Sequence, residues 1–173
     1  FLDDPVLVDY LATIWRPLLA AAQARGDVPA DLNERFAWQL MPVRDRTVNA
    51  FALPGGYFGI HLGLIATVAT ADELASVLAH ELSHVSQRHI SRMMAQQDRQ
   101  MPWLVGAMVL GVLAAHAAKN ADIGQAAMVG GQALAAQTQL NFSRDMEREA
   151  DRVGYGVMTS AGFDGLAFVT MFD

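Results

Sequence analysis

The stretch "VLAHELSHVSQRHI", residues 77–90, decides how this chain is interpreted. It places His80, Glu81 and His84 inside the apolar pattern of a helix. A step of four residues along an α-helix rotates by about 40° and rises by about 6 Å, so both imidazoles project from one side and can share an ion. Glu81 lies to their flank, where it can reach a water molecule on the ion without being a ligand. The spacing therefore predicts a hydrolytic metal site.

A second segment supplies candidates for a third ligand. Zinc sites that perform hydrolysis hold three protein ligands and leave one position for water. In "SRDMEREADRVGYGVMTSAGF", Glu147 and Asp151 are four residues apart on one helix face. Glu147 could complete a His2Glu site while Asp151 accepts the free ring N–H of a ligand histidine. The simpler alternative is a set of packed core histidines and a solvated charged helix, which each segment alone would fit.

Composition restricts the kind of site and partner. Hydrophobic residues make up 53% of the 173 residues and charged residues 17%, which is typical of an ordered globular chain. A net charge of -6 without a basic cluster argues against a nucleic-acid partner. Because the chain has no cysteine, any metal must bind to histidine and carboxylate groups. We expect the other histidines, His61, His89 and His116, to be packed or hydrogen-bonded.

Hydrophobic periodicity and turn residues predict one α+β domain, mainly α, over residues 1–173. A small β-sheet or hairpin lies beside the H-E-x-x-H helix in this prediction. Thr70 and Glu73 have the spacing of a capping box at the start of that helix. The predicted elements are an N-terminal helix (3–26), a β region (34–61) with a turn at Pro54-Gly55-Gly56, the H-E-x-x-H helix (70–98), an apolar helical pair (101–140) and a last helix (143–161).

Taken together, the two segments resemble the zinc metallopeptidase family that contains CAAX prenyl protease type I, the heat-shock protease HtpX and periplasmic relatives in outer-membrane protein quality control. The matching residues are His80-Glu81-Leu82-Ser83-His84, the E-x-x-A-D element from Glu147 to Asp151, and "NAFALPGGYFGI" before the helix. The resemblance implies a gluzincin fold and one zinc ion per chain. It implies His80, His84 and Glu147 as ligands, Glu81 as general base and Asp151 as the partner of a ligand histidine.

The resemblance also bears on substrate and location. It places the segment Asn49, Ala50, Phe51 and Ala52 against the cleft, where an edge strand can pair with an extended polypeptide. It implies a periplasmic protein that binds polypeptide substrates. It also leaves open a peripheral contact with a membrane, or a contact with the outer-membrane assembly machinery. Soluble relatives append helical repeats, which leaves room for a C-terminal region beyond Asp173 in the full-length protein.

The apolar region 101–140 is where the chain departs from membrane-bound members. "MPWLVGAMVLGVLAAHAA" has no formal charge but contains Pro102 and small residues, and it is barely long enough to span a bilayer. We therefore expect a close-packed helical pair that shields the site. The Met93-Met94 pair is expected in the core.

The predicted function is zinc-dependent endopeptidase cleavage of unfolded or misfolded polypeptides in bacterial envelope quality control. Two alternatives stay open. One is a latent or chaperone-like metal-binding module, and the other is the catalytic part of an integral membrane protease. The group that stabilises the oxyanion is open as well, with Arg88, Arg144 and Tyr155 as candidates.

Overall fold

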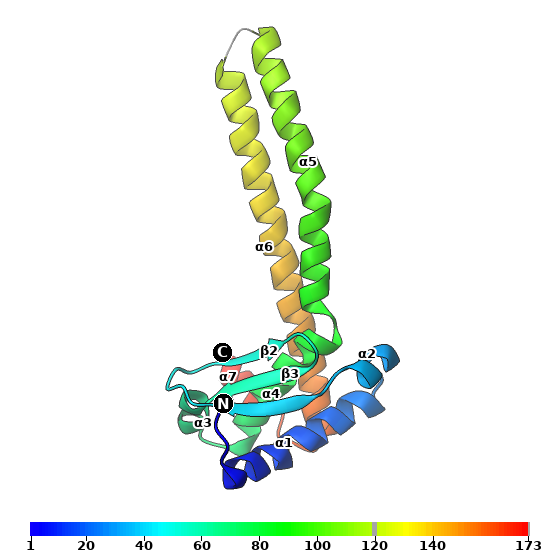
Figure 1. The fold of residues 1–173 in the computed structure, drawn as a ribbon, viewed down its shortest axis with the longest axis vertical. Coiled ribbons are helices and arrows are strands. Elements are labelled where there is room, and N and C mark those ends of the chain that lie inside the picture. The colour runs from blue at the N-terminus through cyan, green and yellow to red at the C-terminus, as the bar shows by residue number, and fades with distance from the viewer. Residues whose placement is uncertain (119–120, 173) are drawn as a thin grey trace. The chain divides into compact units, whose positions relative to one another are not determined.

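A computed structural model describes residues 1–118 and 121–172 of the protein. It does not describe the side chains of residues 104, 111–118, 121–125 and 127–128. The fold is α+β and mainly helical, as the sequence predicts (Figure 1). The elements are α1 (Pro5–Ala24), α2 (Ala30–Arg35), β1 (Gln39–Val43), β2 (Ala50–Leu53), β3 (Tyr57–His61), α3 (Leu62–Thr67), α4 (Ala71–Ser86), α5 (His89–Ala118), α6 (Ala121–Ser160) and α7 (Leu166–Phe172).

Backbone contacts divide the chain into two compact units. The base comprises Phe1–Arg88 and Arg148–Asp173, and the hairpin comprises His89–Glu147. Helix α6 contributes its last turns to the base and the rest to the hairpin. Each unit is described below by itself.

The core of the base forms where α1, α4 and the sheet meet. Asp4 caps α1 by accepting the backbone N–H groups of Val6 and Leu7 at 3.0 and 3.2 Å. The buried stripe of α1 includes Trp15, whose indole N–H donates to the carbonyl of Trp38 at 2.8 Å. Its ring packs on Phe58 of β3, with centroids 4.6 Å apart. Aromatic packing therefore fixes the sheet on α1.

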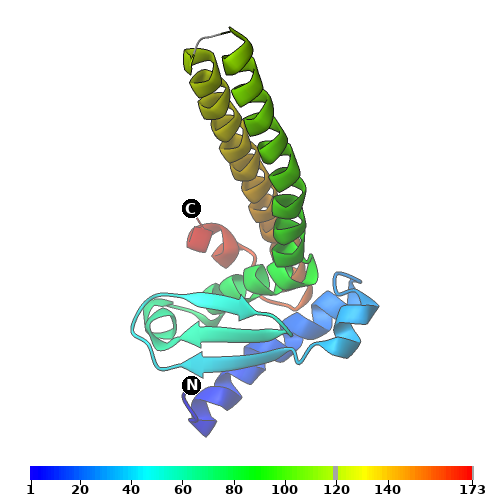
Figure 2. The ribbon, with the colours of Figure 1, turned by 45° about the horizontal axis from the view of Figure 1, so that its top comes forward.

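The sheet has three strands in the order β1-β3-β2, which Figure 2 shows side by side. β1 pairs with β3 in parallel, and β2 pairs with β3 in the antiparallel direction. The turn between β2 and β3 lies at Pro54-Gly55-Gly56, where both glycines have positive φ (90° and 79°). β3 is thus the central strand, so only β2 within "NAFALPGGYFGI" is an edge strand.

The prediction of one continuous helix over 70–98 is wrong. α4 ends at Ser86, Arg88 adopts a left-handed φ of 57°, and α5 starts at His89. The guanidinium of Arg88 pairs with the carboxylate of Asp31, and the buried ring of His89 follows. Tertiary contacts therefore end the helix where the sequence has neither glycine nor proline.

The bounds of the last two predicted elements also differ from the structure. α5 runs through Pro102, and α6 is continuous from Ala121 to Ser160 without a break near Ser143. α5 and α6 run antiparallel as the two arms of the hairpin (Figure 1). The expected core position of Met93-Met94 is wrong, because their exposures are 37% and 63%. Among the residues that the structure describes, none of the helices has both the length and the apolarity needed to cross a membrane.

Candidate metal centre

Helix α4 positions the H-E-x-x-H residues. Thr70 accepts the backbone N–H of Glu73 at 3.1 Å, and the carboxylate of Glu73 accepts the N–H of Ala69 at 2.6 Å. This reciprocal cap fixes where the helix begins. Leu74, Leu78 and Leu82 are buried on its core side. With its start and its buried face fixed, α4 can hold His80 and His84 in one orientation.

The two histidine rings face each other through the same nitrogen atom. Nε2 of His80 lies 3.0 Å from Nε2 of His84, and the ring planes meet at 76°. Two nitrogen ligands about 2.0–2.1 Å from one tetrahedral zinc are about 3.3 Å apart. The observed separation therefore suits a pair of lone pairs directed at a shared cation. His80 is buried and His84 is half-buried.

Asp151 approaches His80 from the other side of the ring. Its Oδ1 lies 3.0 Å from Nδ1 of His80. A carboxylate close to Nδ1 of a histidine favours a proton on that nitrogen, and the lone pair of Nε2 is then available to a metal. The approach depends on Gly154, because a Cβ there would lie 3.2 Å from the backbone of Ala79 and His80. A glycine thus lets α6 pack closely on α4.

Glu147 completes a set of three possible ligands. One ligand atom from each of His80, His84 and Glu147 lies within 4.8 Å of the other two. The carboxylate is exposed and has three rotatable bonds, so it can adjust to an ion. Two imidazoles and a carboxylate are a donor set that suits zinc and leaves a position open. The residues therefore fit a metal cofactor.

Comparison with known proteins agrees with this geometry. The family model of peptidase family M48 matches residues 14–172. The chain belongs to peptidase family M48. The expected resemblance to zinc metallopeptidases of the bacterial envelope is thereby confirmed.

Relatives of this M48 chain come from bacteria and mitochondria. A beta-barrel assembly-enhancing protease of Escherichia coli (strain K12) is 34% identical over 174 residues, which cover 99% of this chain and 33% of the relative. A protein of Vibrio cholerae serotype O1 that carries the same name provisionally is 39% identical over 171 residues. These residues cover 99% of this chain and 33% of that relative. Mitochondrial metalloendopeptidase OMA1 of Schizosaccharomyces pombe is 35% identical over 136 residues, which cover 79% of this chain and 37% of the relative. The chain thus spans about a third of the length of these relatives.

In this M48 chain, β2 presents a row of backbone groups at the edge of the sheet. His61 donates its N–H to the carbonyl of Asn49 at 3.0 Å, so these two residues form a hydrogen-bonded pair. Pairs alternate along an antiparallel ladder, so Phe51 also faces β3, whereas Ala50 and Ala52 direct their N–H and C=O groups away from it. Among the described residues, β2 pairs with β3 alone, and it packs against α4.

Helix α7 places aromatic side chains against His80, a contact that was not predicted from the sequence. The ring of Phe172 stacks on that of His80, with centroids 4.9 Å apart and planes at 29°. Phe168 packs on Phe172 at 4.8 Å, and Tyr155 meets Phe168 edge-on at 6.1 Å. The i, i+4 spacing of Phe168 and Phe172 was the available signal, but it is equally typical of an ordinary core helix.

Other candidate residues of the M48 domain have different partners. His61 is buried, and its Nδ1 lies 2.7 Å from the hydroxyl of Thr47 and 3.7 Å from Asp45. Hydrogen bonds from the backbone and hydroxyl of Thr47 lower the pKa of Asp45. His89 is buried, and His116 lies outside the described side chains.

Two of the three oxyanion candidates also have structural partners. The hydrogen bond from Arg88 to Asp31 lowers the pKa of that carboxyl. Tyr155 packs against Phe168, as described above. Both side chains thus hold parts of the fold together.

Proposed function

We propose that this M48 chain is a zinc-dependent endopeptidase domain that hydrolyses extended polypeptides. The observation that carries the proposal is the line of groups from Asp151 to His80 to His84, with both ring Nε2 atoms 3.0 Å apart and Glu147 in reach. His80, His84 and Glu147 would hold one zinc ion. When bound, the ion supplies Lewis acidity that polarises a peptide carbonyl and acidifies water.

Each of the chain's own residues then has a distinct role. Glu81 follows His80 on α4 and is half-buried, and we infer that its carboxylate reaches a water molecule beside the ligands. It takes the proton of the attacking water and delivers it to the leaving amine, a role worth about 10²–10⁴ in rate. Asp151 holds the proton on Nδ1 of His80 and fixes the ring orientation.

The free edge of β2 supports extended polypeptide as substrate. The outward N–H and C=O groups of Ala50 and Ala52 can pair with the backbone of a peptide, and Asn49 and Phe51 hold the strand in register on β3. Backbone pairing requires an extended chain and reads few side chains. Unfolded or misfolded polypeptides are therefore the substrates that this edge can accept.

The relatives support a place in the bacterial envelope. Two of them carry the name beta-barrel assembly-enhancing protease, one provisionally, and both match nearly this whole chain. We extend that role to this chain as a periplasmic quality-control peptidase that works beside the outer-membrane assembly machinery.

Metal analysis combined with a peptidase assay tests the proposal. The purified chain should contain one zinc per molecule and cleave an unfolded, reduced polypeptide. Glu81→Gln should keep the zinc and the fold but lose about 10²–10⁴ in kcat, because an amide cannot take the proton. Near-normal turnover by Glu81→Gln, or cleavage that survives removal of all metal, would refute the assignment.

A second candidate function is a latent metal-binding module. The stacking of Phe172 on His80 favours the latent module, because α7 then restricts access to His80, a candidate metal ligand. Under latency, Phe172→Ala should raise kcat/KM for a short peptide, whereas Val169→Ala, at an exposed residue of the same helix, should not. Equal activity of the parent chain and both variants would exclude latency through α7.

A further inference from the structure

A cavity lies between α1 and the start of β1, within the base unit. The residues that α1 contributes to it recur at intervals of three and four, so they form one face of the helix. Its volume is about 260 Å³, below the roughly 300–1,000 Å³ of small-molecule sites, so it accommodates the end of a polypeptide rather than a longer segment. The lining includes Val8, Leu11, Trp15 and Arg16 of α1, with Trp38 and Leu40 beside them.

The strand at this cavity, β1, is the second edge strand of the sheet. It lies on the opposite side of β3 from β2, as the arrangement in Figure 2 shows. Gln39 donates its N–H to the carbonyl of Gly56 at 2.9 Å, so the backbone of Gln39 faces the sheet. Because the backbone groups of a strand alternate in direction, Trp38, Leu40 and Pro42 direct theirs away from the sheet.

Two of these three outward positions already have partners. The carbonyl of Trp38 accepts the indole N–H of Trp15 at 2.8 Å. The carbonyl of Pro42 accepts the backbone N–H of Leu2 at 2.9 Å, so another segment of the chain pairs with this edge there. Leu40 lies between them at the cavity, and within the described part of the chain its outward N–H and C=O have no hydrogen-bond partner. The edge is therefore open at Leu40.

Arg16 brings a positive charge to the same cavity. Its side chain is exposed, and among the described residues it takes part in no ion pair or hydrogen bond. Val8, Leu11 and Leu40 supply apolar wall beside it. A guanidinium next to an apolar wall is complementary to a carboxylate that is attached to an apolar side chain.

Trp38 adds a donor that lacks an acceptor. Its side chain is buried, and its indole N–H has no hydrogen-bond partner among the residues that the structure describes. A buried donor without an acceptor destabilises the folded state. A carboxylate or carbonyl oxygen of a ligand is an acceptor of the kind that this donor lacks.

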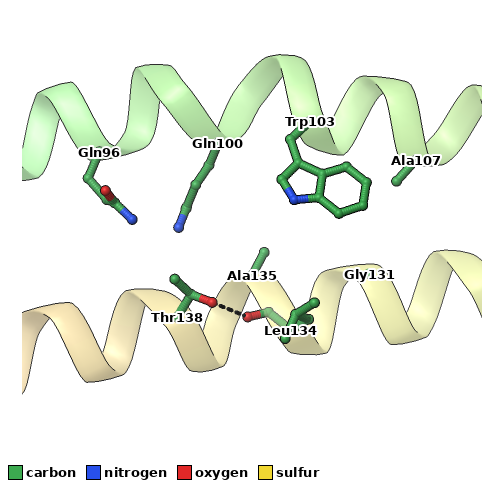
Figure 3. Close-up of a pocket in the computed structure, with 8 residues that line it drawn as sticks. All are labelled: Gln96, Gln100, Trp103, Ala107, Gly131, Leu134, Ala135 and Thr138. Carbon is green, nitrogen blue, oxygen red and sulfur yellow. Dashed lines mark hydrogen bonds between the residues drawn. The ribbon is translucent and has the colours of Figure 1, made fainter.

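The hairpin contains a cavity of different character, with a volume of about 300 Å³. Figure 3 shows the eight residues that line it and the indole of Trp103 directed into it. Its polar side chains include Gln96 and Gln100, and none of the eight residues is charged. Of these two cavities, only the one beside Arg16 combines a cation, an open backbone edge and an apolar wall.

We propose that the cavity between α1 and β1 binds the carboxyl-terminal residue of an extended polypeptide. The terminal carboxylate pairs with Arg16, the adjoining backbone pairs with Leu40, and an apolar last side chain packs on Val8 and Leu11. The site lies on the opposite edge of the sheet from β2 and uses none of the metal centre. It therefore concerns binding alone and holds whether or not the chain hydrolyses peptides.

Fluorescence anisotropy of a labelled peptide tests the proposal on the whole chain. The probe is a short unstructured peptide that ends in leucine and carries fluorescein at its N-terminus, prepared as the free acid and as the C-terminal amide. The measurement uses Glu81→Gln, so that no peptide is consumed. The acid should bind at least about tenfold more tightly than the amide, because the amide lacks the charge that pairs with Arg16. Equal affinity of acid and amide, or no binding of either, would overturn the proposal.

Variants of the cavity locate the bound peptide. Arg16→Gln should reduce the affinity for the acid to that for the amide, whereas Arg46→Gln, at another exposed arginine of the base, should keep the preference. Leu40→Pro removes the outward N–H and should weaken binding of both peptides, and Pro42 shows that an outward position of β1 accepts proline. Circular dichroism checks that the variants keep their fold. A preference for the acid that persists in Arg16→Gln would refute the site.

Decanoate distinguishes a peptide from a fatty acid as the ligand. It has a carboxylate and an apolar body but no backbone that can pair with Leu40. Unlabelled decanoate should displace the probe at least about tenfold less effectively than the unlabelled free-acid peptide, because it forms fewer hydrogen bonds. Equal displacement would show that the cavity takes fatty acids and would contradict the proposal. Either result leaves the peptidase assignment to its own assay.

Discussion

Oδ1 of Asp151 lies 3.0 Å from Nδ1 of His80, so a residue of α6 contacts the ring of a residue carried by α4. The two residues are far apart in sequence, and the base unit contains both. The other nitrogen of the same ring, Nε2, faces His84 at 3.0 Å from its Nε2.

Replacement of Asp151 should weaken zinc binding without unfolding the chain. Asp151→Ala removes the acceptor that orients His80, and such losses reduce metal affinity by about 10–100-fold. Competition with a chromophoric chelator measures the affinity. Asp9→Ala, which removes an exposed carboxylate from α1, is the control and should bind zinc like the parent. Unchanged affinity in Asp151→Ala would contradict the orienting role.

Loss of a ligand should couple metal content to stability. His84→Ala should bind less than stoichiometric zinc and unfold at a lower temperature, because an ion that binds only the folded state stabilises it by about 2.7 kcal/mol at 100 times its Kd. In calorimetry, the parent chain without metal and His84→Ala should unfold at similar temperatures. If the variant holds full zinc, His84 is not a ligand.

A proline in β2 should separate substrate pairing from sheet stability. Ala52 directs its N–H away from β3, so Ala52→Pro removes a donor at the free edge and leaves the ladder intact. KM for an extended peptide should rise while the melting temperature changes little. Phe51→Pro is the control, because it removes an N–H that faces β3 and should destabilise the sheet. Unchanged peptide kinetics in a folded Ala52→Pro protein would argue against strand pairing.

Close packing of α6 on α4 should depend on one glycine. Gly154→Val places a branched side chain against the backbone of Ala79 and His80, where a Cβ alone would lie at 3.2 Å. We expect a loss of about 1–3 kcal/mol of unfolding free energy together with weaker zinc binding. Gly130→Val makes the same change in the same helix at a position with nothing within 4 Å, and its stability should be nearly that of the parent. Chemical denaturation of both variants gives the comparison.

The sequence by itself determined the local parts of this protein. Helical spacing placed His80 and His84 on one face of α4, and Glu147 with Asp151 on one face of α6, because 3.6 residues per turn is a property of the backbone. The glycine turn at Pro54-Gly55-Gly56 and the cap at Thr70 were equally local. Motifs of this kind also carried the family resemblance.

Only the tertiary structure decided how these parts meet. The break at Arg88 comes from its pairing with Asp31, the approach of Asp151 to His80 depends on the space at Gly154, and the stacking of Phe172 on His80 comes from the docking of α7. The exposure of Met93-Met94 was mispredicted for the same reason. Each depends on which distant surface covers a residue, and periodicity along one segment holds no information about that.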